Sequence, residues 1–149
     1  DLDKITPHKS PLSVEKKLFV ERIAERGPVI EPLDKGNSLE VGDKVIVRIS
    51  IKTDRDMEYV HLKDMRAAGF EPANVLSGYK RKGGLGYYES IRDASTNFFI
   101  DYLQKGSYVF EYPLIVSQKG KFSNGITSIQ CMYAPEFASH SEGVRIEIE

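Results

Sequence analysis

The chain has 149 residues, of which 40% are hydrophobic and 29% are charged, and its formal net charge is −1. A chain of this length fits one domain with a core of its own, and its balanced charge lacks the basic face on which nucleic-acid binding depends. The single cysteine, Cys131, excludes an internal disulfide, and no apolar run approaches the ~18 residues of a membrane helix.

Alternation between apolar and polar residues is the dominant pattern along the chain, and it predicts β-strands. In the clearest run, Val45, Val47, Ile49 and Ile51 define one apolar face. Glycine, asparagine and aspartate residues separate the runs and supply the turns between them. The predicted strands, in chain order, are Val14–Arg22, Val45–Lys52, Tyr59–Asp64, Val75–Tyr79, Leu85–Ser90, Asn97–Leu103, Tyr108–Val116, Thr127–Tyr133 and Val144–Ile148.

The pattern predicts an all-β fold, an antiparallel β-sandwich with about seven to nine strands and little helix. The one local helix candidate, Asp64–Ala68, is ended within about one turn by a glycine and a proline. Pro113 falls inside a strand pattern and predicts an edge position or a bulge, because proline cannot donate to a β-ladder. Residues 1–11 are expected to form a linker, and residues 12–149 a single sandwich domain.

Residue types suited to hydrolytic catalysis occur in the chain, but no pattern joins them. They are His61, His140, Asp64, Asp93, Ser95 and Ser141. The sequence contains no Gly-x-Ser-x-Gly nucleophile elbow, and its three separated histidines offer no metal-ligand spacing. We therefore expect a protein that is not an enzyme, with no catalytic residue, no metal site and no cofactor.

Adjacent aromatic residues predict a surface that a partner or a ligand covers. Neighbouring residues of a strand point to opposite faces, so only one residue of the pair Tyr87–Tyr88, and one of Phe98–Phe99, can enter the core. The segment Ala134–Gly143 is expected to be a polar loop, in which Phe137 either docks onto a partner or caps the end of the sandwich.

Four segments carry a resemblance to a known family. They are LEVGDKVIVRI (residues 39–49), DMEYVHLKDMRAAGFEP (56–72), RDASTNFFIDYLQKGSYVFEY (92–112) and the end of the chain (122–149), which contains MYAPEF and SHSEG. Their order and spacing resemble the C-terminal domain of bacterial alpha-2-macroglobulin-like proteins. Two positions depart from that pattern: Ala94 stands where a second acidic residue is common, and Ala67 or Ala68 replaces the usual proline.

The resemblance implies a macroglobulin- or immunoglobulin-like sandwich that is a non-catalytic C-terminal module of an endopeptidase-inhibitor-type parent protein. Such a module packs against a thioester-type domain and shields it. The implied partners are therefore other domains of the parent, with proteases only indirectly involved. The parent would be periplasmic or associated with the cell envelope. The chain itself lacks the Cys-x-x-Gln thioester motif, since no glutamine follows Cys131 at that spacing.

The residues expected at the interdomain interface are Met132, Tyr133, Pro135, Glu136, Phe137, His140, Tyr87 and Tyr88. A different class of function stays open, a stand-alone cell-surface domain for carbohydrate binding or adhesion. Its binding platform would use the adjacent aromatics, although the chain has no tryptophan. Binding to glycans that is lost when Tyr87 or Tyr88 is replaced would discriminate this alternative from the interdomain role.

Overall fold

The computed structural model describes residues 11–33, 39–73, 77–82, 85–123, 125–141, 143 and 145–149. Within them the chain forms thirteen strands and no helix. All pairings between strands are antiparallel, apart from one isolated parallel bridge between Leu39 and Ile148. The predicted fold class, an antiparallel β-sandwich, is thus confirmed, with more strands than the seven to nine that were expected.

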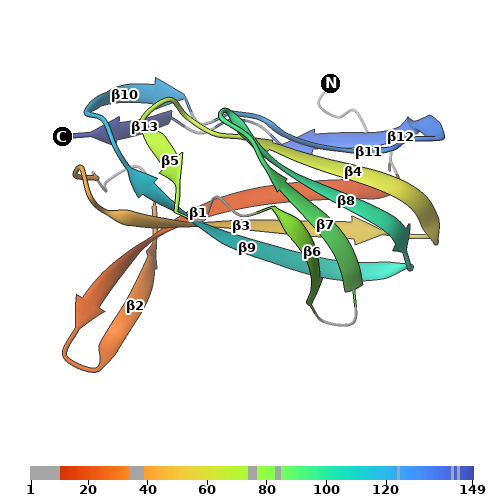
Figure 1. Ribbon diagram of the computed structural model, residues 1–149, viewed down its shortest axis with the longest axis horizontal. Helices are drawn as coiled ribbons and strands as arrows, with labels where there is room; N and C mark the ends of the chain where they lie inside the picture. Colours follow the sequence, from red (N-terminus) through yellow and green to blue (C-terminus); the bar gives the residue numbers. More distant parts are fainter. Residues whose placement is uncertain are drawn as a thin grey trace, which may run out of the picture.

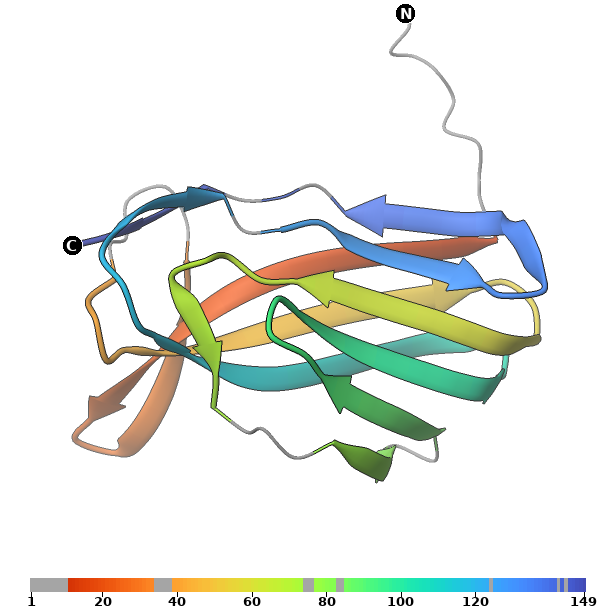
Figure 2. The ribbon, with the colours of Figure 1, turned by 45° about the horizontal axis from the view of Figure 1, so that its top comes forward.

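Two larger sheets form the two layers of the sandwich (Figure 1). In spatial order, the five-stranded sheet contains β2 (Gly27–Pro32), β1 (Leu12–Ala24), β3 (Lys44–Thr53), β9 (Gly106–Val116) and β5 (Phe70–Pro72). The six-stranded sheet contains β12 (Ala134–Ser141), β11 (Thr127–Cys131), β4 (Met57–Met65), β8 (Ser95–Leu103), β7 (Leu85–Ile91) and β6 (Gly78–Lys82). A third, two-stranded sheet pairs β10 (Gly120–Ser123) with β13 (Arg145–Ile148) near one end of the sandwich (Figure 2).

The core lies between the two larger sheets and follows from the alternation in the sequence. On β3, every second residue from Val45 to Ile51 is at most 2% exposed, while the residues between them remain partly accessible or exposed. Aromatic rings from the two sheets meet in the middle, where Phe98 of β8 packs on Tyr87, Phe110 and Tyr112. Each strand therefore buries one face, as a period of two requires.

The segment that was expected to be a polar loop, Ala134–Gly143, is mainly a strand. Residues 134–141 form β12, which pairs with β11 from Thr127↔Ser141 to Cys131↔Ala134. Its serines, histidine and alanines gave no apolar alternation because β12 is the edge of the sheet and buries little of either face. The preceding strand is correspondingly shorter than predicted and ends at Cys131, so that Met132 and Tyr133 form the turn.

Other predictions differ mainly at the sheet margins. The short strands β2, β5 and β10 were not predicted, because they are too short or too exposed to show a clear period. The strand predicted at Val75–Tyr79 begins instead at Gly78, and residues 74–76 lie outside the described residues. Val144 and nearly all of the predicted linker, residues 1–10, also lie outside them.

Pro113 is placed where the ladder between β9 and β5 ends. Its carbonyl oxygen accepts a hydrogen bond from the backbone N–H of Ala73 (3.4 Å), just after β5 finishes at Pro72. The N–H and C=O of a strand residue point to the same side, so the ring nitrogen of Pro113 faces the end of β5. The missing donor therefore falls beyond the last pair of the ladder between β9 and β5, Pro72↔Leu114, where it removes no described ladder bond.

Candidate interaction site

The turn between β11 and β12 presents two large apolar side chains to solvent. Met132 is 50% exposed and Tyr133 is 80% exposed, and together they form the turn of a hairpin that the pair Cys131↔Ala134 closes. We call these two residues the β11–β12 tip. Beyond it the register shifts, because Gln130 pairs with Ala138 and residues 135–137 have no partner on β11.

The tip and the adjacent Cys131 are attached to the neighbouring strand β4 by three contacts. The backbone N–H of Met132 donates to the carbonyl of Tyr59 (2.8 Å), and the Cys131 thiol donates to the carbonyl of Glu58 (3.4 Å). The rings of Tyr59 and Tyr133 pack edge to face, with centroids 5.0 Å apart and an interplanar angle of 72°. This geometry is a favourable one for aromatic pairs. Contacts with β4 therefore hold the tip in one conformation on the surface.

The rest of the bulged segment adds one more aromatic residue beside the tip. Phe137 is half-buried and packs against the core, and the guanidinium carbon of Arg55 lies 5.0 Å from the centre of its ring. This distance is within the range of a cation–π interaction. Pro135 and Glu136 are exposed next to it, and His140 is exposed further along β12. Six of the eight predicted interface residues thus lie on one continuous segment, the tip and β12.

The two remaining candidates, Tyr87 and Tyr88, lie away from the tip on β7. The alternation rule holds for them, since Tyr87 is 8% exposed in the core and Tyr88 faces the outside. The Tyr87 ring packs on Phe98 and Phe110, so little of its side chain is accessible to a partner, and its role at an interface stays a prediction. Tyr88 is separated from the tip by β8 and β4.

Tyr88 belongs to a second aromatic surface, on the outer face of the six-stranded sheet, which we call the outer aromatic row: the exposed Tyr79 and Phe99 and the half-buried Tyr88 and His61. These residues are consecutive partners across β6, β7, β8 and β4. Tyr79 and Tyr88 pack edge to face at 5.0 Å, and His61 stacks on Phe99 at 4.6 Å. A groove of about 600 Å³ lies over the β6 side of the row, with Lys80, Arg81 and Asp101 among its lining residues.

A polar cluster lies inside the sandwich and connects its two sheets. The Asp64 carboxylate on β4 accepts hydrogen bonds from Lys16 Nζ of β1 (2.5 Å), from Thr127 Oγ1 of β11 (2.6 Å) and from the Tyr112 hydroxyl of β9. The side chains of Lys16 and Asp64 are 1% and 0% exposed. Burial lowers the pKa of Lys16, and the Asp64 carboxylate opposes this effect. The cluster fixes how the sheets face each other, because every partner comes from a different strand.

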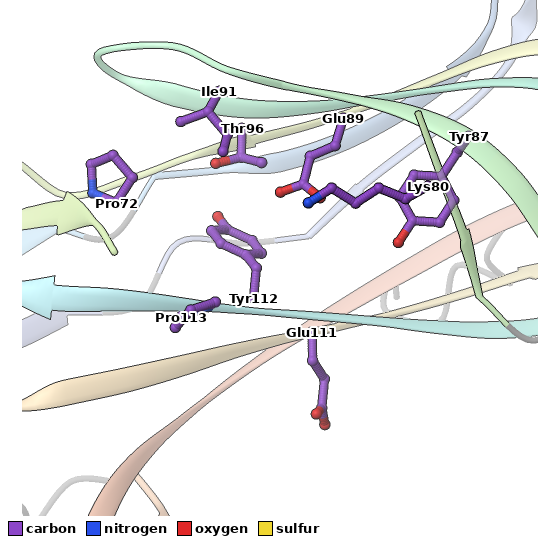
Figure 3. A pocket seen from close by; sticks show the side chains of 9 residues that line it. All are labelled: Pro72, Lys80, Tyr87, Glu89, Ile91, Thr96, Glu111, Tyr112 and Pro113. Carbon is purple, nitrogen blue, oxygen red and sulfur yellow. The ribbon is translucent and has the colours of Figure 1, made fainter. Parts of the chain in front are cut away.

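Tyr112 also lines a small cavity at the open side of the sandwich. This cavity, of about 150 Å³, is bounded by residues of β5, β6, β7, β8 and β9. Figure 3 shows Tyr112 rising from β9 toward Thr96, and the amine of Lys80 lying beside the Glu89 carboxylate. Glu111 points the opposite way, where it pairs with Arg48. Among the described lining residues, each charged side chain therefore already has a partner of opposite charge, Lys80 with Glu89 and Glu111 with Arg48.

The buried hydroxyl of Tyr112 is expected to make the fold sensitive to alkaline pH. Burial, and then the charge of Asp64, raise the pKa of Tyr112 well above its ordinary value. Because the folded pKa lies above the unfolded one, the stabilising contribution is complete below pH ~10 and is lost as the pH rises further. At pH 11 the contribution should therefore be smaller than at pH 8. Urea denaturation at pH 8 and pH 11 should show a smaller pH-dependent loss for Tyr112→Phe than for the wild type, and equal losses would contradict this assignment.

Of the residue types considered for catalysis, the structure connects His61 with Ser95 only indirectly, through Asn97, whose side-chain amide donates to Ser95 Oγ (3.1 Å). His61 lies on the outer face of β4, where its ring nitrogen is 2.8 Å from Asn97 Oδ1, while Asp64 points into the core. Among the described residues no three histidine, cysteine, aspartate or glutamate side chains group as metal ligands do. The described part of the chain also has no helix of the length and apolarity that a membrane span needs. Cys131 is buried, as its place in the apolar alternation predicts.

Two features of the structure were not predicted from the sequence: the polar cluster around Lys16 and the contact of Tyr59 with the tip. Lys16 stands in the inward-facing series of β1, between Val14 and Leu18, so a charged residue at a buried position was a visible signal for the polar cluster. Tyr59 gave no comparable signal, because neither its type nor its neighbours indicates the backbone conformation that places it against Tyr133.

The chain matches one protein family in sequence and is similar in structure to solved proteins. The family model described as the bacterial alpha-2-macroglobulin MG10 domain matches residues 12–136. A similar solved structure, native alpha-2-macroglobulin from Escherichia coli from domain MG7 to the C-terminus, has a TM-score of 0.73 and 14% identity, over 97% of this chain and 24% of that one. The Salmonella alpha-2-macroglobulin mutant Y1175G has a TM-score of 0.71 and 17% identity, over 95% and 9%.

A curated protein is also similar in sequence, "Circularly permutated Ras protein 2" of Dictyostelium discoideum. The two chains are 26% identical over 110 residues, which are 74% of this chain and 3% of that protein. In each of these comparisons the chain spans a minor part of the other protein.

Proposed function

Because the chain belongs to the bacterial alpha-2-macroglobulin MG10 domain family, we propose that it is a non-catalytic module of a larger protein of that family, and that the β11–β12 tip docks onto the parent's thioester-type domain. The observation that carries this proposal is the exposure of Met132 and Tyr133 on a turn that β4 holds in place. Exposed apolar side chains on a fixed turn are suited to burial against another protein surface.

Ordering the side chains of a contact surface costs conformational entropy when two domains bind. Tyrosine brings a large contact area with few rotatable bonds, and an already ordered side chain loses less entropy when it binds. Tyr133 meets both conditions, because its ring is packed against Tyr59 before any partner arrives. Methionine beside it adapts to an irregular apolar pocket. The tip therefore has the composition of an anchor for a neighbouring domain.

This docking would shield the thioester-type domain in an endopeptidase-inhibitor-type parent. The similarity to portions of much longer alpha-2-macroglobulins supports the reading of this chain as one module of several. By the same relationship, the parent would act in the periplasm or at the cell envelope. In this proposal the chain contacts the thioester-type domain and covers it, and it carries out no chemical step.

Replacing Tyr133 by alanine in the full-length parent is expected to loosen the docked thioester-type domain. Loss of a central aromatic anchor costs about 2 kcal/mol or more, which corresponds to a ~30-fold weaker contact. Hydrogen–deuterium exchange in the thioester-type domain, at the peptides that face this module, should become at least ~10-fold faster in the variant. Met132→Ala should act in the same direction with a smaller effect.

Tyr79→Ala provides a matched control for this experiment. Tyr79 is 84% exposed, close to the 80% of Tyr133, but lies on β6 at the other edge of the same sheet. It should leave the exchange of the thioester-type domain unchanged. Equal exchange in Tyr133→Ala and the wild type would reject the docking role of the tip.

The outer aromatic row supports a second candidate, a surface for carbohydrate binding. It combines exposed aromatic rings with a groove bordered by charged side chains, a composition that suits stacking against the apolar face of a sugar together with polar contacts. Saturable glycan binding that Tyr88→Ala abolishes and Tyr133→Ala leaves intact would favour this function over interdomain docking.

A further inference from the structure

Tyr59 has a backbone conformation that is unusual for its residue type. Its φ is +58°, in the left-handed region, and among the described residues it is the one non-glycine residue with positive φ. A bulky side chain seldom adopts this region, and such strain of about 1–3 kcal/mol persists where the surrounding structure holds it in place. Tyr59 is the third of the nine residues of β4, with no turn to require this conformation.

Near Tyr59, the alternation of inward-facing and outward-facing residues shifts by one residue on both β4 and β8. On β4 the buried series runs Met57, Val60, Leu62, so one interval is three residues instead of two. On β8 the same occurs between Ile100 and Leu103, the partners of Val60 and Met57. The rotation of the strand at Tyr59 thus keeps both ends of β4 in the core. The Tyr59 carbonyl extends the ladder between β4 and β11 by one position beyond the pair Cys131↔Val60, where it accepts from the Met132 N–H.

The hairpin alone does not stabilise the conformation of the tip. Two-residue hairpin turns favour types in which one or both central residues have positive φ, and neither Met132 nor Tyr133 has it. The turn therefore depends on contacts from outside the hairpin. These are the contacts with Tyr59, the hydrogen bond from the Met132 N–H to the Tyr59 carbonyl and the edge-to-face packing on Tyr133.

We propose that Tyr59 is a positioning residue that pre-organises the tip for its partner: its carbonyl extends the β4 ladder to Met132, and its ring fixes the orientation of the Tyr133 ring. The inference rests on the proposed function, since the partner is the thioester-type domain. It adds that recognition requires a residue that need not touch the partner itself. Loss of the Tyr59 ring would leave the turn in place but free the Tyr133 side chain.

Two substitutions separate the roles of ring and backbone. Asparagine tolerates the left-handed region, so Tyr59→Asn should retain the backbone conformation and remove the ring, while Tyr59→Phe keeps the ring without the hydroxyl. In the 149-residue chain, NMR with ring-labelled tyrosine would report the mobility of Tyr133, and amide exchange of Met132 would report the hydrogen bond to Tyr59. The midpoint of urea unfolding would show whether the core is intact.

For Tyr59→Asn we expect a mobile Tyr133 ring, Met132 exchange within about twofold of the wild type, and an unfolding midpoint that is not lower. In the full-length parent the same variant should speed exchange of the thioester-type domain by about 10-fold, and Tyr59→Phe should match the wild type throughout. An unchanged Tyr133 ring in Tyr59→Asn would overturn the positioning role. A freed ring without faster exchange, together with an inert Tyr133→Ala, would uphold the positioning of the tip and reject the docking function instead.

Discussion

Replacing Asp64 by alanine is expected to lower the free energy of unfolding by about 3–5 kcal/mol. The carboxylate is the common acceptor for Lys16, Tyr112 and Thr127, and all four side chains are buried. The substitution would leave an ammonium group and two hydroxyl groups in the core without this acceptor. Each unsatisfied group costs free energy beyond the loss of the bond itself.

Chemical denaturation of the wild type and Asp64→Ala would measure this loss, with Asp101→Ala on the exposed side of β8 as a control. The control should change the stability by no more than ~0.5 kcal/mol. Adding Lys16→Met to Asp64→Ala should recover part of the loss, because it removes the uncompensated charge. A loss below ~1 kcal/mol for Asp64→Ala would show that the cluster is hydrated in solution and does not hold the sheets together.

The parts of the fold that could be predicted are those in which one strand face is apolar along its whole length. β3 buries alternate residues over its ten positions, and β9 does so from Phe110 to Val116, so their period is visible in the sequence. β2 and β12 bury little of either face, so neither face has to be apolar and their sequences show no clear alternation. The resemblance that rested on segments between residues 39 and 149 is confirmed by the family match over residues 12–136.

The candidate site was predictable in its residues but not in its arrangement. Met132 and Tyr133 were named from the sequence, and the structure exposes both; their role at an interface stays a prediction. The hydrogen bond and ring contact from Tyr59 join segments more than seventy residues apart. They also depend on a left-handed residue within a strand, for which a tyrosine carries no local signal.

Phe98→Ala is expected to be as destabilising as the change at Asp64, with a loss of about 3–5 kcal/mol. Phe98 is 2% exposed, and its ring lies 5.0 Å from that of Phe110 and 5.8 Å from that of Tyr87, so it joins aromatic residues of both sheets. Its removal would forfeit the burial of a large side chain and leave a cavity that rigid neighbouring strands cannot close.

The adjacent residue provides the comparison, because Phe99→Ala changes the same residue type on the opposite face of the same strand. Phe99 is 39% exposed and has the His61 ring stacked on it, so its loss should cost about 1 kcal/mol. Urea unfolding of the two variants should therefore differ by at least ~2 kcal/mol, with Phe98→Ala the less stable. Similar losses would mean that the outer aromatic row is covered in solution, because only a buried Phe99 could cost as much as the core residue.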